Sequence, residues 1–224
     1  MTTALPASEV HLAEWARRLG VTVAASIYAR PASSRRAGAL AAHTAGHWVH
    51  ADIILEGGGT GALVNSGVEV ALVRELLAES PAMLVDVHVI VRPGAVGWET
   101  AVASVAAELR GAGVARWSAV PAVLSILRAA GGLPAEQWVE VWPPRDGAEI
   151  PPGYGGALAM LIEPGSKGSA DTSTLPSLIA SAPGVSIGVD GGVTPGVASD
   201  AIRDGATYLV IGRALFAGSI TAQA

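Results

Sequence analysis

The sequence predicts a (β/α)₈ barrel of the TIM type, and three observations lead to this prediction. Eight short runs of apolar and β-branched residues recur along the 224 residues, with Ala-rich stretches of helical spacing between them. The runs are continuously apolar and do not alternate, as expected for parallel strands that are covered on both faces. The average unit of about 28 residues is short for this fold but feasible, because such barrels begin near ~200 residues.

The expected elements follow one another with helices between most of the strands. The strands are Val21–Tyr28, Trp48–Leu55, Met83–Val91, Val114–Ala119, Trp138–Trp142, Leu158–Ile162, Val185–Val189 and Tyr208–Ile211. The helices are Ser34–Ala45, Val68–Glu79, Glu99–Gly111, Ala122–Ala130, Thr174–Ala182 and Pro195–Asp204. Several helices begin with Ser, Thr or Pro and end near Gly, which is favourable capping chemistry. The segment Pro143–Gly156 is expected to be a long loop, and a doubly wound open sheet remains an alternative with the same alternation.

Composition limits the class of protein. Half of the residues are hydrophobic and 15% are charged, which is typical of a globular chain. No Pro/Gly/Ser linker divides the sequence, so we expect one barrel domain over residues 1–224. The net charge of −5 provides no electrostatic footprint for nucleic acid. We find no apolar run near ~20 residues and no secretory signal, so we expect a cytoplasmic protein without a membrane segment.

Two residue types are absent or rare, and this narrows the possible chemistry. The chain has no cysteine, which excludes disulfides and thiolate nucleophiles and leaves His and carboxylates to hold any metal. Lys167 is the only lysine, and it is therefore the only candidate for a Schiff-base mechanism.

Four imidazole or carboxylate side chains lie in or at the ends of three expected strands. His50 and Asp52 share the second strand, His88 lies in the third, and Asp190 ends the seventh. The i, i+2 spacing of His50 and Asp52 puts both side chains on one face. Barrel active sites form at the carboxyl ends of strands, so the four are expected to bind one divalent ion, Zn²⁺, Fe²⁺, Mn²⁺ or Co²⁺. Each alone is more often a core or turn residue, and Asp86 beside His88 could be scaffold.

Glycine-rich segments follow the last three expected strands. Such glycines let backbone N–H groups approach an anion, and barrels commonly bind phosphate with the loops after their last strands. We therefore expect a phosphate site there, although ordinary turns would use the same glycines. The candidate residues are Gly165, Lys167, Gly168, Gly191, Gly192, Gly212 and Arg213.

Taken in order, these segments resemble the ribulose-phosphate 3-epimerase family. The matching pieces are Ala25-Ser26-Ile27, Ala45-Gly46-His47-Trp48-Val49-His50-Ala51-Asp52, Asp86-Val87-His88, Met160-Leu161-Ile162-Glu163-Pro164-Gly165, Val189-Asp190-Gly191-Gly192 and Gly212-Arg213-Ala214-Leu215-Phe216. They extend over nearly the whole span from Val21 to Phe216, and the combination of His-x-Asp, Asp-x-His and Val-Asp-Gly-Gly is fairly specific. The resemblance implies a barrel of the ribulose-phosphate-binding type and a homo-oligomer.

The function that this resemblance implies is that of an isomerase of carbohydrate metabolism, as in the pentose phosphate pathway. It would be a metal-dependent epimerase that inverts C3 of a ketose phosphate through an enediolate. His50, Asp52, His88 and Asp190 would ligate the metal, which acts as a Lewis acid. Asp52 and Asp190 would also form the acid/base pair, one on each face of the substrate, because inversion needs two opposed acids.

The expected substrate lining departs from the family pattern. By the same resemblance, Ser26 and Met160 would line the substrate pocket. The family's Met-Asp-Gly after the second strand is replaced by Ile54-Leu55-Glu56-Gly57-Gly58-Gly59, and its Gly-Phe-Gly-Gly-Gln loop by Gly165-Ser166-Lys167-Gly168-Ser169. The substrate therefore stays open between ribulose 5-phosphate, allulose 6-phosphate and another phosphorylated ketose.

Two other functions remain open. A non-catalytic sugar-phosphate-binding paralogue would account for the altered loops, but it has no use for two opposed carboxylates. An aldolase on a phosphate-binding barrel would need Lys167 as its nucleophile. Related decarboxylases and aldolases carry Asp-x-Lys on the third strand, where this chain reads Asp86-Val87-His88.

Overall fold

Eight parallel strands close into a barrel in the computed structural model, which describes residues 10–58, 63–131, 135–147, 149–166 and 168–217. The barrel strands are β1 (Thr22–Ser26), β2 (Trp48–Gly57), β4 (Val85–Val91), β5 (Arg116–Ala119), β6 (Glu136–Val141), β7 (Gly156–Met160), β8 (Ser186–Asp190) and β9 (Tyr208–Ile211). Each strand pairs with the next in this order, and β9 returns to pair with β1. The predicted (β/α)₈ barrel is confirmed, and the open-sheet alternative is wrong.

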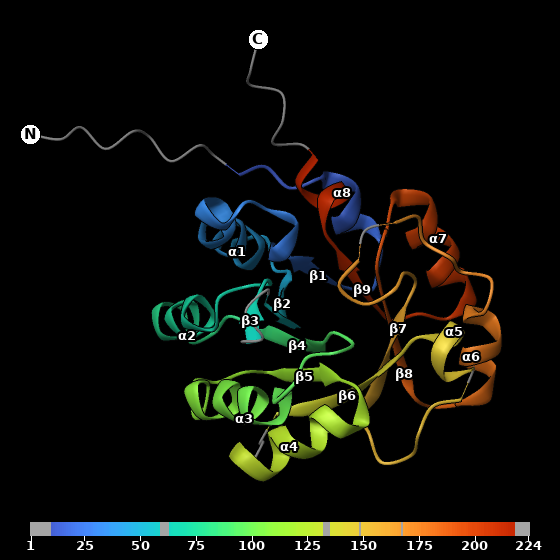
Figure 1. Ribbon diagram of the computed structural model, residues 1–224. Coiled ribbons are helices and arrows are strands. Elements are labelled where there is room, and N and C mark those ends of the chain that lie inside the picture. Colours follow the sequence, from blue (N-terminus) through green and yellow to red (C-terminus); the bar gives the residue numbers. More distant parts are fainter. Residues whose placement is uncertain (1–9, 59–62, 132–134, 148, 167, 218–224) are drawn as a thin grey trace, which may run out of the picture.

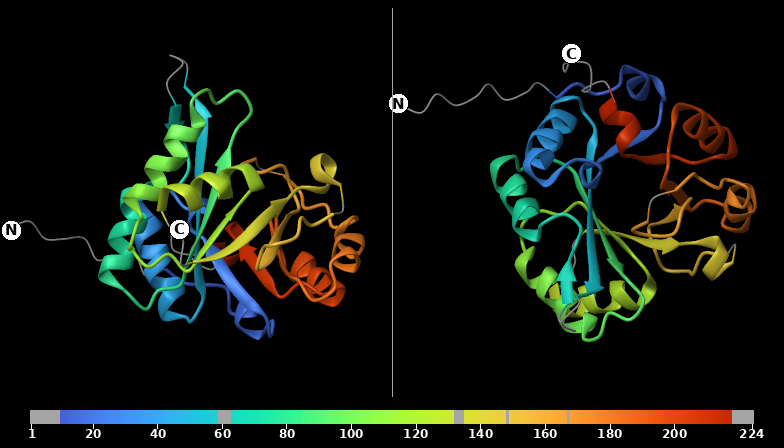
Figure 2. Two further views of the ribbon diagram at one scale, coloured as in Figure 1. Left: turned by 90° about the horizontal axis from the view of Figure 1, so that it is seen from below. Right: turned by 45° about the horizontal axis from the view of Figure 1, so that its top comes forward.

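Helices surround the barrel and cover the outer face of its sheet (Figure 1, Figure 2). The six expected helices are present as α1 (Arg35–Thr44), α2 (Val70–Glu79), α3 (Trp98–Glu108), α4 (Pro121–Gly131), α6 (Leu175–Ser181) and α7 (Pro195–Asp204). A four-residue α8 (Arg213–Phe216) follows β9. The 3₁₀ helix Glu14–Arg18 precedes β1, and the 3₁₀ turns Ile27–Ala29 and Ala32–Ser34 follow it. No helix in the described part of the chain is long and apolar enough to cross a membrane.

Among the short elements that the sequence did not predict are a one-turn helix and a three-residue strand. The expected loop Pro143–Gly156 is a loop only in part, because Pro143–Asp146 forms the one-turn helix α5 and Gly156 already begins β7. The Asp146 carboxylate caps this turn by accepting a hydrogen bond from the backbone N–H of Trp142. Beyond the barrel rim, β2 also pairs in antiparallel fashion with β3 (Leu63–Asn65), where the Asn65 amide oxygen accepts from the backbone N–H of Ile54.

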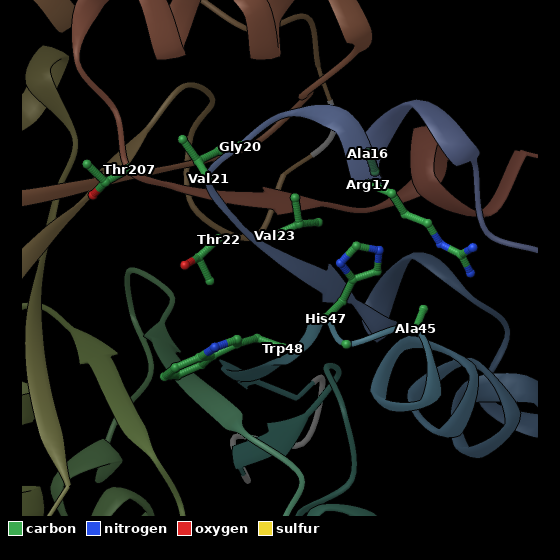
Figure 3. Close-up of a pocket in the computed structure, with 11 residues that line it drawn as sticks. Ala16, Arg17, Gly20, Val21, Thr22, Val23, Ala45, His47, Trp48 and Thr207 are labelled. Carbon is green, nitrogen blue, oxygen red and sulfur yellow. The ribbon is translucent and has the colours of Figure 1, made fainter.

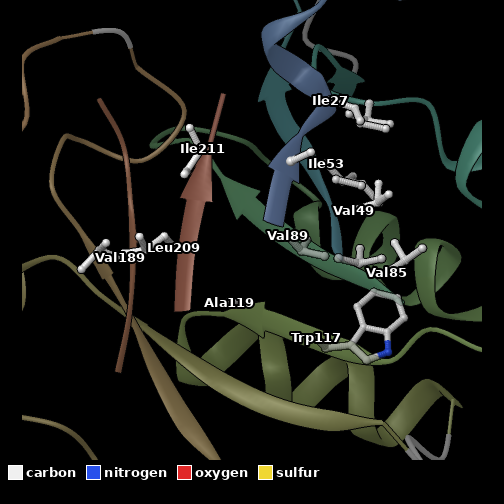
Figure 4. Packing of buried hydrophobic residues seen from close by; sticks show 14 of the residues in the cluster. Ile27, Val49, Ile53, Val85, Val89, Trp117, Ala119, Val189, Leu209 and Ile211 are labelled. Atoms are coloured by element: carbon white, nitrogen blue, oxygen red, sulfur yellow. The ribbon is translucent and has the colours of Figure 1, made fainter. Parts of the chain in front are cut away.

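Alternate residues of each strand face two different layers. The outward set, including Val49, Ile53, Val85, Val89 and Leu209, packs under the helices in the main hydrophobic cluster (Figure 4). The inward residues form a separate cluster inside the barrel. Because side chains alternate with a period of two, residues of like parity on neighbouring strands meet on the barrel axis.

Large side chains fill the barrel towards the amino-terminal ends of the strands. The Arg116 guanidinium lies 4.6, 3.7 and 4.4 Å from the ring centroids of Trp48, Trp138 and Tyr208. Its charge is matched by Glu136, which accepts hydrogen bonds of 3.1 and 2.9 Å from Nε and Nη2. A Cβ at Gly188 would lie 2.7 Å from Trp138, so the packed floor requires a glycine there. Polar site residues occupy the opposite, carboxyl-terminal end.

Candidate metal centre

The four predicted metal ligands meet inside the carboxyl-terminal end of the barrel. Strand β2 contributes His50 and Asp52, β4 contributes His88, and β8 ends at Asp190. The register places Asp52 directly beside His88, and all four have the inward parity. One donor atom from each lies within 4.8 Å of the donor atoms of the other three. Both imidazoles are completely buried, so this geometry is held by packing.

Each imidazole turns one nitrogen towards the two aspartates. His50 Nε2 lies 3.2 Å from Asp52 Oδ1 and 3.7 Å from Asp190 Oδ2. His88 Nδ1 lies 3.3 Å from Asp52 Oδ1 and 3.8 Å from Asp190 Oδ2. The two rings therefore present different nitrogens to the same point, and the carboxylates complete a set of N and O donors that suits a borderline divalent ion.

The other ring nitrogen of His50, here called the outer nitrogen because it does not face the two aspartates of the cluster, is held by a buried hydrogen-bond network. His50 Nδ1 donates to Asp86 Oδ2 over 3.1 Å, and Asp86 also accepts from Ser118 Oγ at 2.8 Å and from Tyr208 OH at 3.0 Å. The Asp86 carboxylate is fully buried and is not one of the four donors of the cluster. Asp86 is thus the scaffold residue of its strand, and it fixes the ring orientation of His50.

The outer nitrogen of His88 has a carboxylate partner of its own. His88 Nε2 donates to Glu140 Oε2 on β6 over 3.0 Å. The other oxygen of Glu140, Oε1, accepts a 2.9 Å hydrogen bond from Arg145 on α5. Glu140 is only 3% exposed, so its charge is compensated by these two partners rather than by water.

The carboxylates keep both imidazoles protonated at neutral pH. Burial alone lowers the pKa of His50, but the charges of Asp52 and Asp86 raise it well above its usual range. Burial likewise opposes protonation of His88, whereas hydrogen bonds to Asp52 and Glu140 raise its pKa to about 9. A divalent cation carries the same charge as the two protons that it would displace from the inner nitrogens, so the donor set fits such an ion.

The two aspartates of the cluster differ in acidity. Burial raises the pKa of Asp52, but the His50 charge and hydrogen bonds from both imidazoles outweigh it and hold the pKa well below its usual range. Burial raises the pKa of Asp190 to about 6; the nearby His50 charge acts against this rise, and the Asp52 charge adds to it. One carboxylate is therefore ionised and the other is close to protonation near neutral pH, a pairing suited to acid/base chemistry.

A cavity of about 980 Å³ opens above the donor cluster. Its walls include Asp52, Asp190 and every other predicted site residue among the described positions except the two buried histidines: Ser26, Met160, Gly165, Gly168, Gly191, Gly192, Gly212 and Arg213. The predicted Lys167 lies outside the described residues. Ser26 Oγ donates a 3.1 Å hydrogen bond to Asp52 Oδ2, which ties the cavity wall to the cluster.

The glycine loops on one side of this cavity approach one another closely. Gly191 and Gly192 follow β8 with φ of +103° and +65°, in the left-handed region that favours glycine. A Cβ at Gly192 would lie 2.9 Å from the backbone nitrogen of Ala170, so the loops after β7 and β8 meet only because a side chain is absent. Exposed Arg213 follows β9 on the same side.

A second cavity of about 700 Å³ lies at the amino-terminal ends of β1 and β2 (Figure 3). Among the described residues its lining includes Arg17, Thr22, His47, Trp48 and Thr207 and no carboxylate side chain. The predicted site residues that the structure describes belong instead to the carboxyl-terminal end.

Sequence reasoning missed the residues that support the cluster. Ser118, Glu140 and Tyr208 face the barrel interior from β5, β6 and β9, and Arg145 reaches in from α5. A signal for Glu140 was present, because a charged residue stands between Val139 and Val141 in an otherwise apolar strand. The pairing partners could not be read from the sequence, because Glu140 and His88 are 52 positions apart.

Comparison with known proteins supports the fold and no specific family. No family model and no curated protein matches the sequence. A mutant tryptophan synthase α-subunit from Pyrococcus furiosus has a TM-score of 0.59 at 13% identity, over 87% of this chain and 88% of that chain. Phosphoribosyl anthranilate isomerase from Thermus thermophilus has a TM-score of 0.59 at 14% identity, over 86% and 88%. At such identities the likeness concerns the fold alone.

Proposed function

We propose that the protein is a metal-dependent epimerase that inverts C3 of a ketose phosphate, such as ribulose 5-phosphate or a related sugar. One observation carries the proposal: two carboxylates of unlike acidity, Asp52 and Asp190, join two imidazoles in one donor cluster at the base of a large cavity. A binding protein has no need of such a pair. The ribulose-phosphate 3-epimerase resemblance of the motifs adds the reaction and the substrate class.

The proposed roles of the aspartates follow from the chemistry of inversion. A proton next to a carbonyl leaves from one face of the carbon, and a second acid must return a proton to the other face. Asp52 and Asp190 come from β2 and β8, which are separated in the barrel by β1 and β9. Ser26 and the imidazoles orient Asp52 by hydrogen bonds, so its carboxylate keeps one direction throughout the proton transfer.

The proposed cofactor is one divalent ion, Zn²⁺, Fe²⁺, Mn²⁺ or Co²⁺, held by His50, Asp52, His88 and Asp190. When bound, it would supply Lewis-acid stabilisation of the negative charge that develops on the substrate oxygens. The four side chains would also exclude water from the base of the cavity, because three of them are buried and Asp190 is only partly exposed.

The phosphate is proposed to lie against the glycine loops after β7, β8 and β9. Backbone N–H groups can approach an anion where Gly165, Gly191 and Gly192 carry no side chain, and the charge of Arg213 would favour it. Among the similar solved structures, phosphoribosyl anthranilate isomerase is by its name an isomerase of a phosphoribosyl compound. By the resemblance to the ribulose-phosphate 3-epimerase family, Ser166 and Ser169 replace the Phe and Gln of the family's loop, and this leaves the sugar to be identified by experiment.

The test is an epimerisation assay with metal-loaded protein. Ribulose 5-phosphate and allulose 6-phosphate are incubated separately, and the C3 epimer is measured by chromatography. Chelator-treated protein and the Asp190→Asn variant serve as controls. We expect the epimer of one substrate with loaded protein and none with either control.

Other outcomes separate the alternative functions. Phosphosugar binding without turnover by the loaded protein would contradict the epimerase and support a sugar-phosphate-binding barrel. Carbon–carbon cleavage that disappears in Lys167→Ala would instead support the aldolase.

A further inference from the structure

The two imidazoles of the donor cluster are held in opposite senses. His50 points Nε2 inward and Nδ1 outward, whereas His88 points Nδ1 inward and Nε2 outward. Each outward nitrogen has its own buried carboxylate, Asp86 for one ring and Glu140 for the other. An imidazole can offer a lone pair from either nitrogen, so the outer partner decides which nitrogen faces the ion.

Glu140 is fixed more firmly than its single contact with His88 implies. Its Oε2 accepts from His88 Nε2 at 3.0 Å and its Oε1 accepts from Arg145 at 2.9 Å, so both oxygens are held. The Glu140 side chain is 2% exposed, and a buried carboxylate without partners is strongly unfavourable. The carboxylate therefore has one stable position, and that position sets the ring of His88.

Arg145 brings the segment after β6 into this arrangement. It lies on the short helix α5 and also pairs with Asp146, whose carboxylate caps the same turn. A chain of hydrogen bonds thus runs from α5 through Arg145 and Glu140 to Nε2 of His88. The Arg145 side chain is 42% exposed, so this chain begins at the surface and ends inside the barrel.

We propose that Glu140, clamped by Arg145, is a positioning residue that keeps the proton of His88 on Nε2 and directs Nδ1 at the metal site. This inference rests on the proposed function, because it concerns the ion that the donor cluster would hold. It also gives α5 a role, since the helix supplies the cation that makes a buried Glu140 tolerable. Glu140 itself is neither one of the described residues that line the cavity nor one of the four donors.

The test measures Co²⁺ affinity by competition with a chelator, together with the visible absorption spectrum of the bound ion. Glu140→Gln retains an oxygen that accepts from Nε2–H and loses the charge, whereas Glu140→Ala loses both. We expect affinity to fall by up to about tenfold in Glu140→Gln and by about 10- to 100-fold in Glu140→Ala, with an altered spectrum in the latter. The Co²⁺ affinity of Arg145→Met should lie between that of Glu140→Gln and that of the unchanged protein.

The matched control is Glu136→Gln, on the same strand but paired with Arg116 at the other end of the barrel. It should leave affinity and spectrum unchanged even if it lowers the melting temperature. If Glu140→Ala fails to fold, Glu140→Gln and ¹⁵N NMR of the histidines decide. The loaded unchanged protein should retain a proton on His88 Nε2, and a proton on Nδ1 would overturn the proposal.

The outcomes separate this proposal from the proposed function. Co²⁺ uptake by the unchanged protein, with the same affinity and spectrum in Glu140→Ala, overturns the positioning role and leaves the epimerase standing. Absence of uptake by the unchanged protein overturns the metal-dependent function and the positioning role together. If Co²⁺ affinity falls in Glu140→Ala as expected but the unchanged protein epimerises no ketose phosphate, the proposed function alone is contradicted.

Discussion

The two halves of the barrel contribute different groups to the site. In one, the side-chain half, β2, β4 and β6 contribute charged residues at or below the base of the cavity, and buried hydrogen bonds fix them, as in the pairs His50–Asp86 and His88–Glu140. In the other, the glycine half, the segments after β7 and β8 bring Gly165, Gly191 and Gly192 to the cavity wall, among mostly small or apolar side chains. By our proposal, the first half would bind an ion through its donor atoms, whereas the second would bind an anion through backbone N–H groups. Asp190, followed by Gly191, belongs to both.

The largest effect on turnover is expected for a substitution of Asp190, which joins the two halves. Asp190→Asn removes a proposed ligand and a proposed acid/base group, so turnover should fall by at least about 10²- to 10⁴-fold. The fold should persist, because Asn has nearly the same size and the hydrogen bond from Leu161 N–H is accepted by the backbone oxygen of Asp190, which the substitution keeps. Steady-state kinetics and circular dichroism check this, with Asp200→Asn, at a half-exposed position on α7, as control. Near-normal turnover in Asp190→Asn would break the proposed link between the halves.

The side-chain half should make metal affinity depend strongly on pH. The raised pKa values of His50 and His88 mean that protons occupy the inner nitrogens at neutral pH and must leave when an ion binds. Affinity should therefore fall as pH falls, by about ten- to a hundredfold for each pH unit between 8 and 6, as one or two protons compete. Below the Asp190 pKa of about 6 a further proton competes. Chelator competition at several pH values measures this, and a flat profile would contradict the donor set.

The glycine half should respond in binding rather than in chemistry. Arg213→Ala removes a positive charge beside the proposed phosphate, so KM for a phosphorylated ketose should rise about 3- to 10-fold with little change in kcat. The effect should shrink at high salt, because exposed charges are screened. Arg203→Ala, on the outer helix α7, is the matched control. A fall in kcat with unchanged KM would place Arg213 in the chemistry instead.

The smallest effect is expected for Ser118, which supports His50 through Asp86. Ser118→Ala removes one of the hydrogen bonds to Asp86, so the free energy of unfolding should fall by about 0.5–1.5 kcal/mol. Metal affinity should change only slightly, because His50 and Tyr208 still hold the carboxylate. Urea unfolding and Co²⁺ titration measure the two quantities. A loss of affinity as large as that expected for Glu140→Ala would show that Asp86 is held less firmly than the geometry indicates.

The sequence predicts the four donor residues better than the residues that hold them in place. The two-residue period along β2 and β4 is enough to put His50, Asp52 and His88 on the inner face, and the barrel then brings Asp190 to them. Glu140 follows the same parity, yet its role depends on partners from β4 and α5 that no local pattern reveals.

Local geometry that depends on contacts with residues distant in the chain could not be predicted from the sequence either. Strand β3 has only three residues, and its pairing depends on the Asn65 amide, which bonds to β2 eleven positions earlier. Gly192 is recognisable as a turn residue, but the contact that requires it, with Ala170 of another loop, is tertiary. Strand and helix periods therefore locate the barrel, whereas the loops that would bind the sugar depend on contacts made only after folding.

The most direct test of the two-carboxylate account is solvent exchange at C3. Metal-loaded protein is incubated in D₂O with ribulose 5-phosphate, and separately with allulose 6-phosphate, and early time points are followed by NMR. The account predicts deuterium at C3 of the epimer while the remaining substrate is still unlabelled, because one carboxylate removes hydrogen and the other returns solvent deuterium. An epimer without deuterium, or no exchange in either sugar by protein shown to hold its ion, would contradict it.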